Sequence, residues 1–372
     1  MDDSSDSSGI KPDGAPSVDG TTGKRPKLAD VARAAGVSTA SVSYALNGLP
    51  GVSDENRRRV VQVAKQLGFR PNRLARALRN GQTKMLGLLL ADIANPFYPE
   101  IASAIVTEAT ARGYEVFLSH AGLHGQLQRD AVSALLDRQS DGLLFTSVVE
   151  NDRELLTELL DAQVPLVQVV RQIEGLAADF VGIDDRMAGR DIARHVLTTG
   201  RRRPAVLGGP AESSASRDRL AGYREAFAEQ AVEIVHPDWI EGDLTRESGY
   251  TRAVALLGDS KTAPPDALVC ANDMIALGAI DALYEVGLRV PGDVAVVGYD
   301  DMSFASSRLI GLTSVGVPRT EMGRVAVRVL LQRMHDPAAL PQKIVLPHSL
   351  VVRQTCGAAP AVPAGRRRRA GS

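Results

Sequence analysis

The chain has 372 residues, of which 44% are hydrophobic and only 4% aromatic, and its formal net charge is −1. That length exceeds one compact domain, so we expect two or three cores built on Val, Leu, Ile and Ala. No run of ~18 apolar residues is present, which argues against a membrane-spanning helix. Cys270 and Cys356 lack metal-ligand spacing, so we expect two free thiols in a reducing cytoplasm.

Charge is unevenly distributed along the chain. Residues 1–23 carry five Asp and one Lys, whereas residues 24–84 carry thirteen Lys or Arg against three acids, a net charge of +10. A compact basic block joined to an acidic body indicates a module that binds a polyanion. The acidic start has no apolar core, so we expect residues 1–23 to be a disordered tail and not a secretion signal. Residues 358–372, rich in Pro, Ala and Gly and then basic, are expected to be a second disordered tail.

Three short helices are predicted within residues 27–68. The first covers about 28–36, the second runs from a Ser38 cap to about Asn47, and the third follows a Ser53 cap and reaches about Leu67. The residues expected to face inward are Leu28, Val31, Ala32, Ala35, Val42, Leu46, Val60, Val63, Ala64 and Leu67. This order is typical of a helix-turn-helix unit. A generic three-helix bundle is the alternative, and the basic charge favours DNA binding over it.

A short basic segment follows at residues 70–85. Pro71 prevents the preceding helix from continuing, and "NRLARAL" has the pattern of two helical turns. So short a helix is marginal in water, so we expect it to order only when another element holds it.

From Met85 onward, short apolar runs alternate with amphipathic helical stretches. The predicted strands are "MLGLLLA", "EVFLSHA", "GLLFTS", "PLVQVV", "FVGID", "PAVLGG", "ALVCAN" and "DVAVVGYD", and residues 98–113 give one of the helices. This order predicts parallel sheets with helices on both faces, and the length favours two such sheets over one. A ligand would then lie between them, beyond the carboxyl ends of the strands.

The chain resembles the lactose-repressor (LacI-type) family of bacterial transcription regulators, because seven motifs follow one another in the order found in that family. They are "KLADVARAAGVSTASVSYALNG", "RPNRLARALR", "GLLLADIANPFYPEIASAI", "FVGIDDRMAGR", "RLAGYREAF", "CANDMIALGAIDALYEVGLRVPGDVAVVGYDD" and "PRTEMGR". The resemblance implies an α-helical helix-turn-helix headpiece (24–70), a hinge helix (71–84) and an α/β core (85–357). That core would contain two doubly wound, parallel-sheet subdomains similar to periplasmic sugar-binding proteins. Subdomain N would span about 85–183 and 314–342, and subdomain C about 184–313 and 343–357.

The resemblance also implies a division of labour in the headpiece. The second helix would enter the major groove, with base edges met by Thr39, Ala40 and Tyr44. The positions expected to touch phosphate or lie at its edge are Ser38, Ser41, Asn47, Ser53, Asn56 and Arg57. Tyr44 departs from the Arg of the best-known family member and lacks the forked contact of Arg with guanine. Packing of Tyr44 against the third helix is the alternative.

The hinge would be a second DNA reader. Leu78 matches the leucine that family members insert into the minor groove, Arg79 would lie beside it, and Asn72 and Arg73 would contact phosphate. The alternative is that Leu78 packs on the core, which Pro71 and the nearby arginines disfavour. Since a wedge needs two hinge helices, a homodimer on near-palindromic double-stranded DNA is expected.

In the core, the resemblance implies a site for a small effector, a sugar or related metabolite. The residues expected to bind it are Phe97, Tyr98, Arg219, Leu244, Asn272 and Asp300. Leu244 stands where several relatives have an aromatic ring and Val170 where several have Asp, which favours a smaller or less hydroxylated ligand than a simple hexose. For some of these residues a structural role is the alternative: helix capping by Asp300 or Asn272, and a surface ion pair for Arg219.

Two other classes of protein compete with this hypothesis. An enzyme is disfavoured because no Gly-rich phosphate loop, metal-binding cluster or nucleophile motif is found, so we expect neither catalysis nor a cofactor or metal. A transport-binding protein outside the cytoplasm is disfavoured by the basic headpiece and the missing signal segment. We therefore expect a cytoplasmic repressor whose DNA affinity responds allosterically to an effector.

Overall fold

The computed structural model describes residues 26–69, 82–122, 125–237, 240–259 and 263–358. The chain divides into two compact units, 1–79 and 80–372. The predicted acidic tail, almost all of the basic tail and most of the predicted hinge lie outside the described residues, including Asn72, Arg73, Leu78 and Arg79.

The first unit contains three helices around a small apolar core. They are α1 (Leu28–Ala35), α2 (Thr39–Leu46) and α3 (Asp54–Gln66). Val31, Val42 and Val60 are fully buried at their centre. Leu67 was expected to face inward, but 41% of it is exposed. The reason is that α3 ends at Gln66 and the chain reverses through Gly68, which has a φ of 64°, so that Phe69 packs against the core instead.

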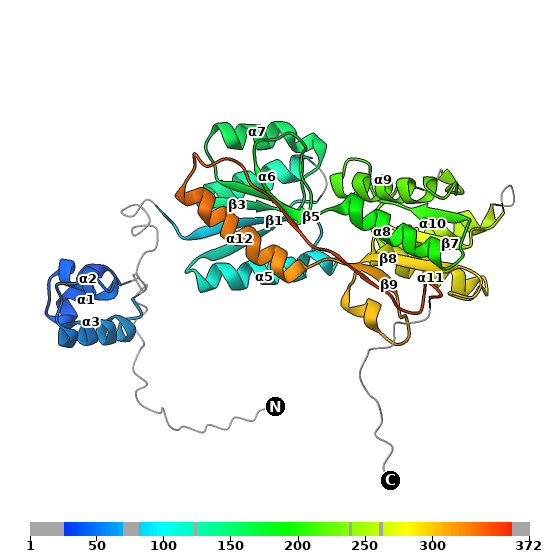
Figure 1. The fold of residues 1–372 in the computed structure, drawn as a ribbon. Coiled ribbons are helices and arrows are strands. Elements are labelled where there is room, and N and C mark those ends of the chain that lie inside the picture. Colours follow the sequence, from blue (N-terminus) through cyan, green and yellow to red (C-terminus); the bar gives the residue numbers. More distant parts are fainter. Residues whose placement is uncertain (1–25, 70–81, 123–124, 238–239, 260–262, 359–372) are drawn as a thin grey trace, which may run out of the picture. The chain divides into compact units, whose positions relative to one another are not determined.

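The second unit begins with a six-stranded sheet in which every pairing is parallel. Its strands are β1 (Met85–Leu90), β2 (Glu115–His120), β3 (Gly142–Phe145), β4 (Leu166–Val169), β5 (Asp179–Ile183) and β10 (Lys343–Leu346), in the order β10-β5-β4-β3-β1-β2. Helices α5 (Phe97–Ala111) and α12 (Arg319–His335) cover one face, and α6 (Gly125–Asp137) and α7 (Arg153–Asp161) cover the other (Figure 1).

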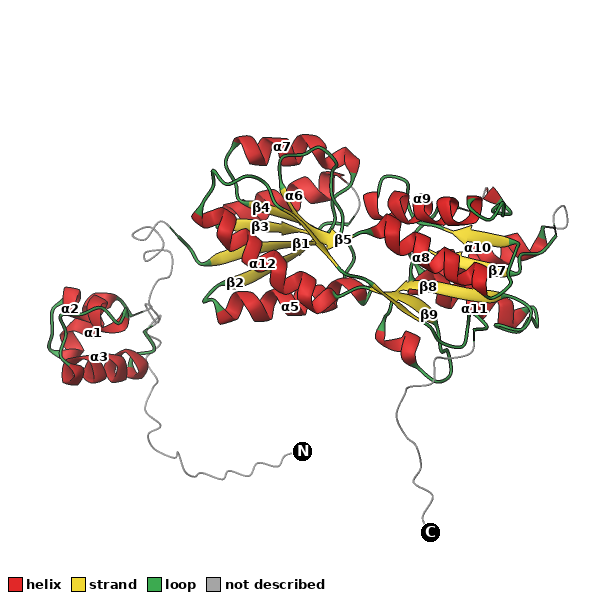
Figure 2. Cartoon of the chain, viewed as in Figure 1, coloured by secondary structure: helices red, strands yellow, loops and turns green. Residues whose placement is uncertain are grey.

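A second sheet has five strands in the order β11-β9-β8-β7-β6. They are β6 (Pro204–Leu207), β7 (Ala267–Cys270), β8 (Ala295–Asp300), β9 (Thr313–Gly316) and β11 (Ser349–Val351), and β11 alone among them runs antiparallel to its neighbour. Helices α8 (Asp185–Thr198) and α9 (Ser214–Ala228) lie on one face, and α10 (Arg246–Gly258) and α11 (Asp273–Glu285) on the other. Figure 2 shows both sheets lying between layers of helices.

Three connections join the two sheets. They lead from β5 to α8, from β9 to α12 and from β10 to β11. The resemblance implied crossings near 183, 314 and 343. The first crossing does follow β5, which ends at Ile183. The two later crossings come a few residues further on, after Gly316 and Leu346, because β9 belongs to the second sheet and β10 to the first. The predicted fold class, a helical headpiece with a two-sheet α/β core, is confirmed. Within the described part of the chain, no helix is both long and apolar enough to cross a membrane.

Candidate functional site

Helix α2 presents the predicted base-reading residues on its exposed side. The Ser38 hydroxyl accepts a hydrogen bond from the Ser41 backbone N–H at 3.0 Å and so caps the first turn. Thr39 and Ala40 lie exposed directly after this cap. Tyr44 follows Ala40 by one helical turn and is 46% exposed. A methyl-sized atom on Gly51 would lie 3.7 Å from Cδ2 of the Tyr44 ring, so the ring borders the loop before α3.

The residues predicted to contact phosphate also stabilise the headpiece itself. Arg57 donates one hydrogen bond to the carbonyl oxygen of Ala45 (3.2 Å) and another to that of Leu49 (2.7 Å). The Ala45 carbonyl lies in the last turn of α2 and also accepts from the Gly48 backbone N–H at 3.4 Å, whereas the Leu49 carbonyl lies in the loop beyond that helix. Asn47 donates from its side chain to the Ser43 carbonyl, and Ser53 caps α3. Arg57 and Asn47 therefore fix the loop that follows α2.

In the core, the structure brings all six predicted effector residues to one buried cavity between the two sheets. Phe97, Tyr98, Arg219, Leu244, Asn272 and Asp300 line it, together with Asn95, Val170, Arg171, Ser213, Ala215 and Ser216. The cavity lies beyond the carboxyl ends of β4 and β8, which is the edge expected for a ligand. Its volume is about 20 Å³, room for about one water molecule, so the two halves of the core are closed around it.

Strained backbone is found at this cavity. Val170 has a φ of 71°, an unusual value for a β-branched residue, and Asp300 has a φ of 106°. The next residue, Asp301, has a φ of 49°. Such conformations persist only where surrounding contacts hold them, and they gather at ligand sites.

A charged network underlies the wall formed by the second sheet. The Arg219 guanidinium donates to Asp185 (2.8 Å) and to the Ala271 carbonyl (2.7 Å), and it lies 3.7 Å from the centre of the Tyr299 ring. Arg219 reaches Asp185 because α8 and α9 pack closely. A Cβ on Gly189 or Gly222 would collide with backbone of the facing helix. The predicted surface ion pair of Arg219 is therefore a buried one.

Asp300 lies at the edge of that network, with one carboxylate oxygen 3.9 Å from Arg219. Burial raises the pKa of Asp300 to about 7, although Arg219 opposes the shift. Asn272 does cap α11, because its side-chain oxygen accepts from the Ile275 N–H at 2.8 Å. Its amide nitrogen donates to the Leu244 carbonyl, and the residue still lines the cavity. Capping and a place in the site are thus compatible.

The cavity wall formed by the first half of the core carries a second buried arginine, Arg171, which the sequence analysis did not single out. Arg171 is 3% exposed and donates to the Tyr98 hydroxyl at 2.8 Å. The Tyr98 ring in turn meets Phe97 edge to face, with centroids 5.2 Å apart. Asn95, Ser213, Ala215 and Ser216 were also missed. The position of Arg171 just beyond a parallel strand was the available signal, since ligands bind at that edge.

Direct contacts hold the two halves of the core together beside the cavity. Arg319, at the start of α12, pairs with Glu100 (2.7 Å) and donates to the carbonyl oxygens of Asp300 and Asp301. The Gln172 backbone N–H donates to the Ser214 hydroxyl at 3.0 Å. A separation of the two halves would break these contacts.

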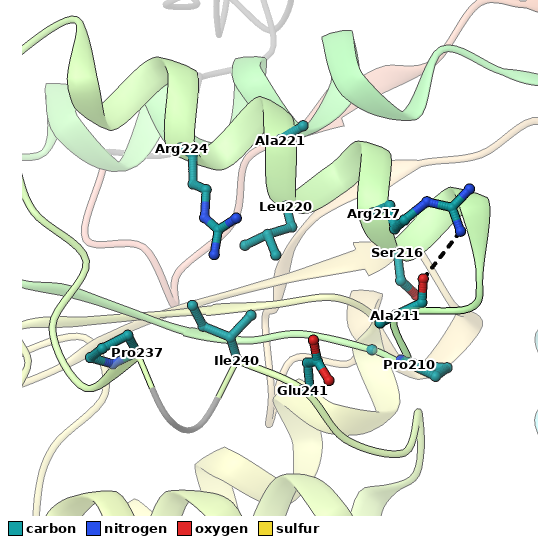
Figure 3. Close-up of a pocket in the computed structure, with 11 residues that line it drawn as sticks. Pro210, Ala211, Ser216, Arg217, Leu220, Ala221, Arg224, Pro237, Ile240 and Glu241 are labelled. Carbon is teal, nitrogen blue, oxygen red and sulfur yellow. Dashed lines mark hydrogen bonds between the residues drawn. The ribbon is translucent and has the colours of Figure 1, made fainter.

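A larger cavity, of about 520 Å³, lies on the second half of the core alone. Leu220 and Arg224 of α9 face Ile240 and Glu241 across it, and Arg217 donates to the Ala211 carbonyl at its rim (Figure 3). Arg224 and Glu241 are both exposed. Because this cavity opens to solvent and receives nothing from the first sheet, it is a surface groove and not the predicted site.

A basic helix-turn-helix headpiece and a two-sheet core with a polar cavity between the sheets define a class of ligand-responsive DNA-binding regulators. Comparisons with known proteins agree. Residues 27–72 match bacterial regulatory proteins of the lacI family, and residues 193–356 match the periplasmic binding protein-like domain. The chain is 32% identical to the regulator DegA of Bacillus subtilis over 88% of its length and 96% of that protein. It is 32% identical to the repressor PurR of Escherichia coli, covering 90% and 97% of the two chains.

Among solved structures, the lac repressor dimer bound to operator and the anti-inducer ONPF is similar, with a TM-score of 0.80 and 30% identity. That similarity covers 90% of this chain and 99% of the repressor chain. The complex of the regulator CelR with cellobiose has a TM-score of 0.68 and 33% identity, covering 89% and 100%. This chain belongs to the LacI family of bacterial transcription regulators. The predicted class, a DNA-binding regulator and not an enzyme, is confirmed by that membership.

Proposed function

We propose that this protein is a repressor that binds a near-palindromic operator as a homodimer and responds to a small metabolite held between its core subdomains. One observation carries the proposal. Six residues named from the sequence, which come from both halves of the core, line a single buried cavity at the strand ends. A site divided between two halves can change their arrangement when a ligand binds, because the ligand contacts both.

In this proposal the domains are a headpiece at 24–70, a hinge at 71–84 and a core at 85–357. Thr39, Ala40 and Tyr44 read base edges in the major groove, while the hydroxyls of Ser38 and Ser41 and the neighbouring polar residues meet phosphate. Leu78 and Arg79 of the hinge enter the minor groove, with Asn72 and Arg73 on phosphate. The operator complex of the related lac repressor supports this arrangement.

A dimer is supported by the edge of the first sheet. Strand β2 ends that sheet, and its side chains Phe117 and Leu118 are 38% and 43% exposed. Exposed edge strands with apolar side chains are usually covered by another element or another chain. The related lac repressor is a dimer on its operator.

The hinge and the core are joined by a defined contact. Asp141, which precedes β3, accepts hydrogen bonds from the backbone N–H groups of Thr83 and Lys84, each at 2.8 Å. The chain that leaves the hinge is therefore fixed to the first half of the core. An effector that binds two arrangements of the core unequally would change the spacing of two such anchors in a dimer and, with it, the affinity for DNA.

Fluorescence-anisotropy titration of DNA from upstream of the protein's own gene tests the proposal, with random duplex as competitor and candidate metabolites added. We expect tighter, salt-sensitive binding to the upstream DNA and a change in affinity with one metabolite. Ala40→Asp is the control, since a carboxylate in the groove should abolish DNA binding and leave the core intact. Equal affinity for upstream and random DNA at all salt concentrations would contradict the proposal.

A further inference from the structure

We infer that the metabolite held in the cavity between the core subdomains carries a carboxylate or phosphate group, and that Arg171 recognises it. The inference rests on the proposed function of that cavity. It starts from the burial of Arg171, which is 3% exposed and lines the cavity wall formed by the first half of the core. Its nitrogen Nη1 has no hydrogen-bond partner among the described residues. A charged group is rarely buried without a partner, because its lost hydration must be replaced.

Three other shielded arginines of the core each pair with a carboxylate, and the buried Arg252 donates to backbone carbonyl oxygens such as that of Gly208 (2.9 Å). Arg219 pairs with Asp185 at 2.8 Å, Arg319 with Glu100 at 2.7 Å and Arg333 with Asp179 at 2.8 Å. For Arg171, by contrast, no carboxylate of the described chain lies within 4.0 Å, and its hydrogen bond goes to the Tyr98 hydroxyl. Burial raises the pKa of Tyr98, so this partner is a neutral phenol and supplies no counter-charge.

Asp300, the acidic residue that lines this cavity, makes no ion pair with Arg171 within 4.0 Å among the described residues, although the charge of Arg171 opposes the rise in the pKa of Asp300 that burial causes. Asp300 faces Arg219, and its pKa of about 7 leaves it only partly ionised at neutral pH. The other cavity residues of the first half, Asn95, Phe97, Tyr98 and Val170, are uncharged. A ligand oxyanion would supply the missing charge, and the planar donor fork of arginine matches carboxylate and phosphate oxygens.

The opposite wall has a different chemistry, which fixes the orientation of such a ligand. Ser213, Ser216, Asn272 and Asp300 offer hydroxyl, amide and carboxyl groups suited to hydroxyls of the ligand. The ligand would therefore place its anionic end on the first half of the core and its hydroxyls on the second. At about 20 Å³ the closed cavity admits no such molecule, so entry requires the halves to separate.

Thermal unfolding of the full-length protein with matched probes tests this inference. The probes are glucose, glucuronate, glucose 6-phosphate and inorganic phosphate, each in excess and at equal ionic strength, with chloride as reference. We expect at least one of the three anions to raise the Tm of the wild type by roughly 2–4 °C more than glucose does. Arg171→Met should lose that gain and, without ligand, should unfold at or above the wild-type Tm, since an unpaired buried cation is removed.

Arg224→Met is the matched control, because Arg224 lies at the separate surface groove and has no ion pair among the described residues. This variant should keep the anion-dependent rise in Tm. The inference is overturned if no anion stabilises the wild type beyond glucose, if Arg171→Met keeps the full gain, or if Arg224→Met loses it. Operator binding by the same samples is measured separately, so failure here leaves a DNA-binding repressor with a neutral effector.

Discussion

Asp300 combines a buried carboxyl group with an unusual backbone conformation at the cavity between the core subdomains. Its φ of 106° and its raised pKa both cost free energy in the folded state, and both occur where a ligand hydroxyl would bind. Its ionisation is therefore linked to the stability of the core. The pKa of Asp300 is about 7 in the folded chain, against an ordinary value of 3.8.

We predict that Asp300→Asn changes how the stability of the core depends on pH. Between pH 4 and 7 the folded carboxyl holds a proton that the unfolded chain releases, so this group destabilises the fold as pH rises to 7. The free energy of unfolding of the wild type should fall relative to the variant, by up to ~1.4 kcal/mol per pH unit. Urea titrations of both proteins at pH 5, 6, 7 and 8 measure this. A constant difference across that range would contradict the prediction.

Tyr44 is the largest exposed side chain of α2, and it differs from the Arg that the resemblance leads one to expect. We predict that Tyr44→Arg shifts the base preference at one position of each half-site toward guanine, because Arg can make two hydrogen bonds to it. Affinity for a panel of single-base operator variants measures the shift. If the variant and the wild type rank the panel identically, Tyr44 does not read DNA.

The six residues predicted to bind an effector were named one at a time from the resemblance, and the structure places all six at one cavity. Arg171 was missed because no motif marks it after its strand. Its hydrogen-bond partner, the Tyr98 hydroxyl, lies 73 residues away in the sequence. Ser213 and Ser216 were missed for a related reason. They begin the helix that carries Arg219, and a serine before a helix is read first as a cap.

At the level of single elements, the end of α2 depends on a side chain of α3. We predict that Arg57→Ala lowers the free energy of unfolding of the headpiece by about 1–3 kcal/mol, since two hydrogen bonds from a charged donor to the Ala45 and Leu49 carbonyls are lost. It should also weaken binding to all DNA sequences about equally and flatten the salt dependence. Arg58→Ala is the control, because Arg58 is exposed and bonds to the Asp54 carbonyl of its own helix.

Thermal unfolding and salt-dependent DNA titrations of both variants separate the two roles of Arg57. If Arg57→Ala lowers the stability of the headpiece but leaves the salt dependence of DNA binding unchanged, Arg57 stabilises the fold and does not contact phosphate. An unchanged stability would show that its hydrogen bonds to α2 contribute little.

Eight predicted strands correspond to β1 through β8, because each is a short, mostly apolar segment between turn signals. Strands β9, β10 and β11 were not predicted. The run "TSVG" of β9 is half polar, and its hydroxyls bond within the core. Strands β10 and β11 are short and lie at sheet edges with partly exposed side chains. Their pairing depends on partners far away in sequence, so no local pattern marks them.

At the level of the whole molecule, a regulator of this kind has a core and DNA-binding parts that are separable in function. We predict that Leu78→Ala weakens operator binding at least tenfold, since the minor-groove wedge is lost, while effector binding to the core is unchanged. Anisotropy titration with operator DNA measures the first property, and thermal unfolding with added effector measures the second. A variant with wild-type operator affinity would remove Leu78 from the DNA interface.

The central claim, a dimeric regulator that reads a specific operator, is tested most directly by selection of bound duplexes from a random-sequence pool. The full-length protein is used, and the enriched DNA is sequenced after several rounds at physiological salt. We expect one enriched, near-palindromic sequence whose two halves are read by two copies of α2. A pool that remains random, or an enriched site without two-fold symmetry, would contradict it.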